Sequence, residues 1–312
     1  SLFDNCYALE SINFGNINTA AVENMYGMFS GCGQLVTLDL SKFDISKVTD
    51  IQWMFNGCSK ITSFDLSHWS FAKMEVMNNA FSACSSLEKI NFGNSGTPFL
   101  RELQSTFEGC NILNSVDLSN FDLSHVIIKN SMFKGCTNLI SVKFGNTRTS
   151  SLKEMGEMFK NCEKIKSIDL SNFDFSNVEN MKYTFSNCKE LLSIDFGNIE
   201  TTSLLEAEGL FQNCEKLPTI DLSRFGFSKT ISFEFLFHSC YTLESVTFGN
   251  IPTSALENMR QSFNNCYKLQ SVDLSSFDFS RITTMEETFR FCYNLRSVNL
   301  GNSQTSSLLD MF

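Results

Sequence analysis

The chain has 312 residues, of which 42% are hydrophobic and 19% are charged, and its formal net charge at pH 7 is −10. An acidic chain lacks the basic surface that nucleic-acid binding requires, so we predict no nucleic-acid partner. The sequence contains no uninterrupted apolar stretch of about 18 residues or more, so we also predict no membrane-spanning segment.

The cysteines reveal an internal repeat. Twelve of them recur at intervals of 26 residues, from Cys6 to Cys292, without insertion or deletion. Phe stands three positions before every cysteine, and Leu or Ile stands three positions after it. A fixed period of this length is the signature of stacked supersecondary units. We therefore predict a repeat solenoid of twelve 26-residue coils that forms a single domain over residues 1–312.

Each coil begins with a segment that alternates polar and apolar residues after its cysteine. Residues 167–170, Ser-Ile-Asp-Leu, are an example, and this alternation is typical of a strand with one buried face. Copies of this strand predict a stacked parallel sheet with one face in solvent. A turn follows at Gly-Asn or Ser-Asn. The chain then returns through a second apolar pair to residues 180–185, where Met181 and Phe185 are four positions apart and predict a short helical turn.

The motif carried by residues 159–174 is more specific. It reads Phe-x-x-Cys-x-x-Ile-x-Ser-Ile-Asp-Leu-Ser-Asn-Phe-Asp, and it resembles the BspA-type, or Treponema-type, leucine-rich repeats of bacterial and mycoplasmal surface proteins. The resemblance covers all twelve coils. It implies a leucine-rich-repeat fold, an extracellular or cell-surface location, and a role in adhesion or protein binding. It brings no shared catalytic residues, so we predict neither an enzyme nor a cofactor.

The coils are of two kinds. One kind has Gly-Asn after the strand and Thr three residues later, as at Thr201, and the other has an aromatic residue and then an apolar one, as at Phe173 and Phe175. From Cys58 onward the two kinds alternate with a period of 52 residues. We predict that large side chains of one coil pack against small ones of the next inside the core, and that the coil spacing or curvature changes near residues 40–75, where two aromatic coils follow each other. An exposed aromatic stripe is the alternative.

The cysteines and phenylalanines are predicted to form a buried structural ladder. No Cys-x-x-Cys and only three His occur, so we predict no zinc site. Cysteines related by one coil have parallel Cα–Cβ bonds, which holds their Cβ atoms about 4.8 Å apart, farther than a disulfide usually allows. We therefore expect free, buried thiols. The central members of this ladder are Phe133, Phe159, Phe185, Cys136, Cys162 and Cys188.

A candidate binding surface lies on the exposed face of the predicted sheet. Five positions after the cysteine stands Ser or Thr, with Lys89 as the exception, and seven positions after it stands Asp or Asn, except at Lys143 and Thr247. The predicted candidate residues are Asp169, Asp195, Asp221, Ser167, Ser193 and Thr219. The alternative is a solvated ladder of polar groups. We predict no metal site, because a hard cation needs about six or more oxygens around one point.

Two functions remain open. The first is a scaffold that binds a protein or glycan ligand through its sheet face. The alternative is a self-assembling protomer whose copies stack end to end into an extracellular filament. Both ends of the chain lie inside a repeat, and no cap is visible in the pattern. We expect further repeats or the next subunit to cover them, because uncapped solenoid ends expose apolar surface.

Overall fold

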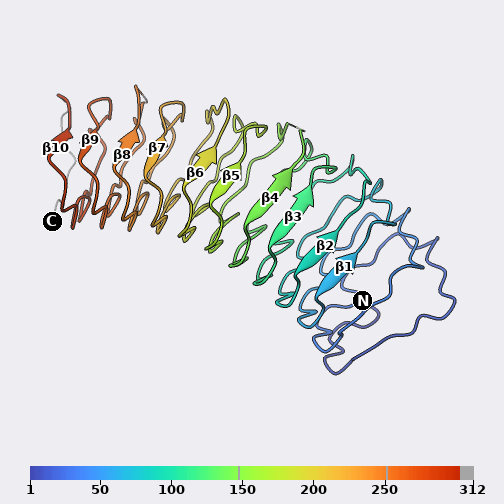
Figure 1. Cartoon of the computed structure of the whole chain (residues 1–312). Coiled ribbons are helices and arrows are strands. Elements are labelled where there is room, and N and C mark those ends of the chain that lie inside the picture. The colour runs from blue at the N-terminus through green and yellow to red at the C-terminus, as the bar shows by residue number, and fades with distance from the viewer. Residues whose placement is uncertain (147, 251, 303–312) are drawn as a thin grey trace. The chain divides into compact units, whose positions relative to one another are not determined.

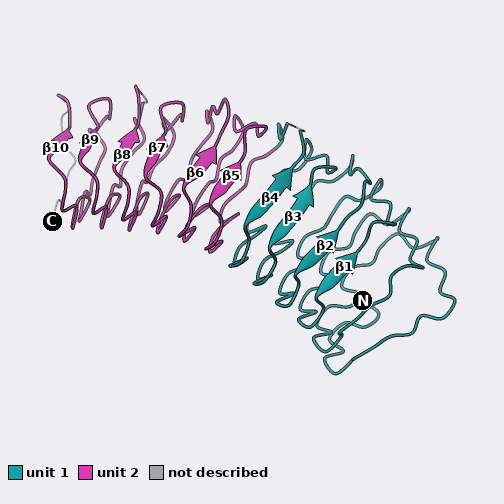
Figure 2. Ribbon diagram, in the orientation of Figure 1, with its two compact units in different colours: residues 1–151 teal, residues 152–312 magenta. Residues whose placement is uncertain are grey.

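In a computed structural model of the chain, residues 1–146, 148–250 and 252–302 are described. The chain separates into two compact units, unit 1 (Ser1–Ser151) and unit 2 (Leu152–Phe312), shown in different colours in Figure 2. In each unit the chain winds as a parallel β-solenoid with coils of about 26 residues. The prediction that the whole chain is one domain stays a prediction.

One short strand marks each coil from Cys58 onward (Figure 1). Unit 1 holds β1 (Ser63–Asp65), β2 (Lys89–Asn91), β3 (Ser115–Leu118) and β4 (Ser141–Phe144). Unit 2 holds β5 (Ser167–Asp169), β6 (Ser193–Asp195), β7 (Thr219–Asp221), β8 (Ser245–Thr247), β9 (Ser271–Asp273) and β10 (Ser297–Asn299). The coils at Cys6 and Cys32 have no assigned strand, so the number of coils with a strand is slightly smaller than the predicted twelve.

The strands pair two by two. β1 pairs with β2, β3 with β4, β5 with β6, β7 with β8, and β9 with β10, all of them parallel. The sheet within each unit is therefore divided into two-stranded pieces rather than continuous. Each pair joins an aromatic coil to the Gly-Asn coil that follows it. The 52-residue period of the sequence is thus also the period of strand pairing.

The glycine of the Gly-Asn coil allows close approach to the preceding coil. Gly197 has φ of +56°, and a Cβ added there would lie 2.5 Å from the carbonyl oxygen of Ser171. Gly93 lies in the same way against Ser67, at 2.6 Å. Because any larger residue would push against backbone atoms, glycine is required wherever a Gly-Asn coil pairs with the coil before it.

The threonine of the Gly-Asn coil binds the coil that follows. Thr201 is fully buried, and its Oγ1 accepts a hydrogen bond from the Gly226 N–H at 2.8 Å and donates to the Gly226 carbonyl at 3.3 Å. Thr19 holds the N–H and carbonyl of Asp44 in the same manner, at 2.7 and 2.9 Å. The Gly-Asn coil therefore has a distinct contact on each side, which explains why the two kinds of coil alternate.

We expect Thr201→Val to lower the free energy of unfolding by roughly 1–2 kcal/mol, because the half-buried N–H and carbonyl of Gly226 would lose their partner. Thr202→Val is the matched control, since the Thr202 side chain is exposed and makes a single hydrogen bond to the Ser176 carbonyl at 3.0 Å. Denaturant titration measures both changes. Equal losses would show that the buried hydroxyl has no special role.

Aromatic rings recur throughout the core, together with Leu, Met and Cys side chains. Phe159, Phe185 and Phe211 stack nearly parallel, with ring centroids 6.0 and 5.7 Å apart. The aromatic residues of the second coil type are also buried; they are Phe43, Trp69, Phe121, Phe173, Phe225 and Phe277. The predicted buried core is therefore confirmed, and the exposed aromatic stripe is excluded at these positions.

Packing between the two kinds of coil is not simply large against small. Phe196 of a Gly-Asn coil meets Phe225 of the next aromatic coil edge to face, with ring centroids 5.2 Å apart. Phe92 and Phe121 meet in the same way at 5.0 Å. Large groups of both coil types thus touch each other, and the alternation depends at least as much on the glycine and threonine contacts.

The predicted short helix at residues 180–185 is wrong. Asn180 forms isolated parallel bridges to the coils on either side, the residues from 182 onward form turns, and no α-helix occurs within the described residues. Tyr183 has φ of 53°, in the left-handed region that a right-handed helix excludes. The N–H groups of Met181, Tyr183 and Phe185 donate to carbonyls of the next coil, at 2.9, 2.8 and 3.0 Å. Every second amide therefore joins two coils instead of closing a helical turn.

One lysine occupies a core position. Lys129 is fully buried, whereas the residue nineteen positions after the cysteine is apolar in the other described coils, as at Leu103. Burial lowers the pKa of Lys129 to about 7. An unfolded lysine has a pKa of about 10.4, so folding favours the neutral amine. At low pH the buried amine is charged, and this lowers the stability of the folded state.

We expect the free energy of unfolding to rise as the pH increases from about 7 towards 10, because over this range the folded state has lost a proton that the unfolded state keeps. Lys129→Met should stabilise the protein at pH 7 and below and remove this rise. Denaturant titrations at several pH values test it. Parallel pH profiles for the two proteins would contradict it.

Candidate binding surfaces

The first two predicted acidic residues are neighbours on the sheet face. On β5 and β6, Ser167 is in register with Ser193, and Asp169 with Asp195. All four are exposed, while the intervening Ile168 is buried. The alternation seen in the sequence thus places these hydroxyls and carboxylates on one solvent-exposed face.

The third pair of predicted residues lies across a hollow. Thr219 and Asp221 are on β7, which pairs with β8 rather than with β6. β6 and β7 flank a hollow of 330 Å³. Its lining includes Ser193, Asp195, Thr219 and Asp221, together with Leu192 and Arg224. Four of the six candidate residues therefore surround one concave site within unit 2.

Each of these aspartates also closes the turn after its strand. Oδ1 of Asp169, Asp195 and Asp221 accepts a hydrogen bond from the N–H two residues later, at 2.9, 2.8 and 2.8 Å. The hydroxyl and amide of Ser171 hold the pKa of Asp169 below its usual value. This role was not predicted from the sequence. Its signal was the constant two-residue spacing from Asp or Asn to a following Ser or Gly.

The acidic face of unit 2 differs from that of unit 1. In unit 1, Lys143 on β4 pairs with Asp117 on β3, at 3.3 Å between Nζ and Oδ2. Among the described residues, neither Asp195 nor Asp221 enters an ion pair, and the nearby Arg224 donates to Asn198 at 2.8 Å. The hollow between β6 and β7 is therefore flanked by two carboxylates that belong to no ion pair of the described residues, and Arg224 lines the same hollow.

These acidic groups do not converge as a metal site. Within residues 1–146, 148–250 and 252–302, no group of three or more His, Cys, Asp or Glu side chains is placed to hold a metal ion.

The same described residues contain no helix that is long and apolar enough to cross a membrane.

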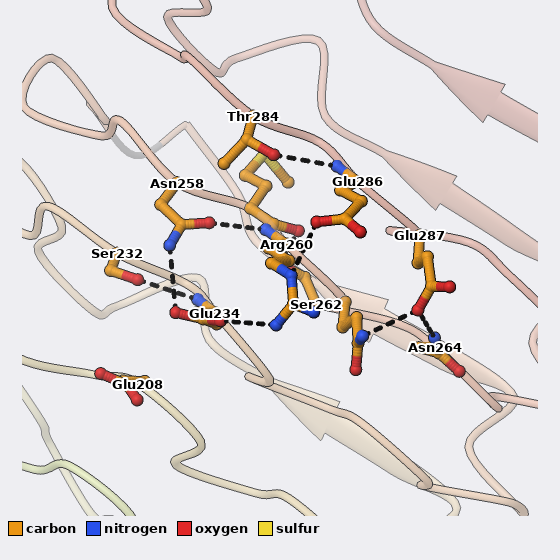
Figure 3. Close-up of polar contacts among 12 residues, drawn as sticks. Glu208, Ser232, Glu234, Asn258, Arg260, Ser262, Asn264, Thr284, Glu286 and Glu287 are labelled. Atoms are coloured by element: carbon orange, nitrogen blue, oxygen red, sulfur yellow. Dashed lines mark hydrogen bonds and ion pairs between the residues drawn. The ribbon is translucent and has the colours of Figure 1, made fainter. Parts of the chain in front are cut away.

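A second polar ladder runs along the return path of the coils in unit 2 (Figure 3). Ser232, Asn258 and Thr284 each accept a hydrogen bond from the N–H two residues later, at 3.1, 2.8 and 3.2 Å. Arg260 bridges Glu234 and Glu286 in the adjacent coils, at 3.0 and 2.8 Å. Because Arg260 already has carboxylates on both sides, this ladder connects coils and offers no unpaired cation at that point.

The predicted structural ladder of phenylalanines and cysteines lies in the core. Phe133, Phe159, Phe185, Cys136, Cys162 and Cys188 are all fully buried. The cysteines are free. The Cys188 thiol donates to the Phe159 carbonyl of the preceding coil at 3.2 Å, and the same bond recurs along both units. Burial raises the pKa of Cys58 and Cys110 to about 12, so these thiols remain protonated donors.

Comparisons with known proteins agree with this architecture. The sequence matches the family described as "Mycoplasma protein of unknown function, DUF285" over residues 1–95, 101–225 and 206–312. A leucine-rich repeat protein from Bacteroides ovatus is 22% identical and has a TM-score of 0.61, covering 99% of this chain and 70% of its own. A leucine rich cell surface protein from Faecalibacterium prausnitzii is 16% identical, with a TM-score of 0.41 and coverage of 89% and 83%. A comparison with curated proteins gave no match. The fold is thus a leucine-rich-repeat solenoid.

Proposed function

The chain belongs to the DUF285 family, and from this membership and its leucine-rich-repeat fold we propose that it is a protein-binding scaffold that acts through the sheet face of unit 2. Leucine-rich-repeat solenoids are typically non-catalytic binding scaffolds, because stacked coils present one repeated surface over a long distance. The observation that carries the proposal is the hollow between β6 and β7, flanked by Asp195 and Asp221.

The chemistry of the hollow favours a basic protein segment. Two carboxylates without ion pairs stand on either side, and Leu192, which is 48% exposed, provides an apolar contact at its edge. A lysine or arginine of the partner would meet the carboxylates, while an adjacent apolar side chain would cover Leu192. The net charge of −10 would also draw a basic partner towards the chain.

We place this activity at the cell surface, in adhesion, because of the resemblance to BspA-type repeats. A protein ligand is favoured over a glycan, since the hollow offers carboxylates and an aliphatic side chain rather than an exposed aromatic platform. Antibody labelling of intact cells tests the location. Labelling that requires permeabilised cells would exclude a surface role.

We expect the double variant Asp195→Asn/Asp221→Asn to weaken binding of a basic peptide about tenfold or more, because each removed charge leaves a cationic side chain without its partner. Asn should preserve the turns, since Asn91 and Asn299 occupy the same position and accept the same hydrogen bond, at 3.0 and 3.1 Å.

Peptides selected from a random displayed library on the wild-type chain provide the probe, and fluorescence anisotropy measures their affinity. The control is Asp65→Asn, which removes a carboxylate from the sheet face of unit 1. Selected peptides that lack basic residues, or that bind the double variant as tightly as the wild type, would contradict the proposal.

A further inference from the structure

Unit 1 carries a surface feature that the repeat does not require. Fifteen positions after the cysteine, the other described coils have Lys, Arg, Ala, Ser or Asn, whereas the coils from Cys84 and Cys110 have Phe99 and His125. Phe99 is 48% exposed, and Ile127, two residues after His125, is 42% exposed. These side chains are therefore not explained by burial in the core.

The same residues surround a hollow. It has a volume of 410 Å³ and is lined by Pro98, Phe99, Arg101, His125, Ile127 and Ser151. The size is within the usual range for small-ligand sites, about 300–1,000 Å³. Phe99 and Ile127 supply an apolar surface, and Arg101 and His125 supply hydrogen-bond donors. None of these residues lies on a strand, so the hollow is separate from the sheet-face residues of the proposed function.

The polar side of this hollow includes the guanidinium of Arg101, although the protein as a whole is acidic. Lys73 lies beside it, with Nζ 5.4 Å from the centroid of the Phe99 ring. The ion pairs found in the described part of unit 1 join Lys134 to Glu108 and Lys143 to Asp117. Lys73 and Arg101 take part in neither of them, whereas His125 interacts electrostatically with the carboxylate of Asp122. A guanidinium and an imidazole beside an apolar wall match a ligand that has both an anionic and an apolar part.

We propose that this hollow binds a phosphate or carboxylate group attached to an aromatic body. Arg101 and His125 donate to the anionic oxygens, the aromatic body lies against Phe99 and Ile127, and Lys73 adds positive charge at the edge. Each half of the ligand is needed, because the hollow presents the apolar and cationic surfaces side by side.

The test is ligand-observed NMR on the whole chain with defined probes. Phenyl phosphate and phenylacetate carry both parts of the proposed ligand, whereas phenol and inorganic phosphate each carry one. At least one of the first two should show saturable binding about tenfold tighter than both of the others. Preference for phenyl phosphate assigns the anion as phosphate, and preference for phenylacetate assigns it as carboxylate. Equal binding of all four, or of none, overturns the proposal.

Variants locate the binding. Arg101→Gln and Phe99→Ser should each weaken the preferred probe about tenfold or more, because one removes the charged donor and the other removes the apolar wall. Serine occurs at the equivalent position 151, so the fold should tolerate it, and circular dichroism checks this. Lys47→Gln is the control. It removes an exposed cation outside the hollow, at the repeat position that Phe99 occupies in its own coil. Full binding by both Arg101→Gln and Phe99→Ser would place the ligand elsewhere and overturn the proposal.

Discussion

Phe185→Ala is expected to lower the free energy of unfolding by about 3–5 kcal/mol, which is the usual cost of emptying a buried phenylalanine site. Phe185 is fully buried and stacks on Phe159 and Phe211 in the coils on either side, with interplanar angles of 10° and 9°. Phe196 also meets its edge at 6.0 Å. Because the rings above and below are held by their own coils, they cannot easily collapse into the cavity.

The control for this prediction is Lys189→Ala in the same coil. Lys189 pairs with Glu163 at 2.8 Å, but both side chains are about two-fifths exposed, at 41% and 42%. An exposed pair of this kind contributes about 1 kcal/mol or less. Urea titration of both variants gives the comparison, and similar losses would mean that the phenylalanine stack is not the main source of stability.

Gly197→Ala is expected to cost about 2–5 kcal/mol, the sum of a left-handed backbone strain of about 1–2 kcal/mol and an overpacking cost of about 1–3 kcal/mol. The strain arises because φ is +56°, and the overpacking arises because the new Cβ would lie 2.5 Å from the Ser171 carbonyl oxygen. Relief would require β5 and β6 to move apart, which would weaken their hydrogen bonds.

Gly15→Ala separates the two contributions. Gly15 has the same φ of +56°, but no heavy atom would lie within 4 Å of an added Cβ. The Gly15→Ala variant should therefore lose only the stability that corresponds to the backbone strain, about 1–2 kcal/mol. Thermal and urea unfolding of the two variants measure the difference, and equal destabilisation would show that the close approach of the coils is unimportant.

The coil length, the buried positions and the position of the strands could be predicted from the sequence. The Phe and Cys of Phe185 and Cys188 recur in phase in every coil, and the position of Leu191 is always Leu or Ile. A repeated apolar position must be buried because each coil packs against near copies of itself. The alternation at Ser167, Ile168 and Asp169 likewise predicts which side chains reach solvent. These features depend on patterns within one coil.

The candidate site was predicted only in part. Sequence spacing placed Asp169 and Asp195 side by side, and the structure pairs them in register. The same spacing treated Asp221 as the next member of an even row, but the break between β6 and β7 instead makes a hollow. The second hollow, at Phe99, Arg101 and His125, was not predicted, because it is formed by residues of neighbouring coils that depart from the repeat pattern.

The turns before the cysteines and the strand pairing were not predicted, because they depend on how two coils fit together. Residue positions just before the cysteines carried one overlooked signal: Asn5, Gly31 and Asn161 belong to a series that is mostly Asn or Gly, and all twelve members adopt positive φ. A residue with positive φ cannot be part of a right-handed helix, so a helix cannot continue through this position. The pairing follows from contacts 25 or 26 residues apart, such as Gly197 against Ser171 and Thr201 with Gly226. The periodicity of the sequence indicates which residues are buried. Which coils can share hydrogen bonds depends on the distance between their backbones.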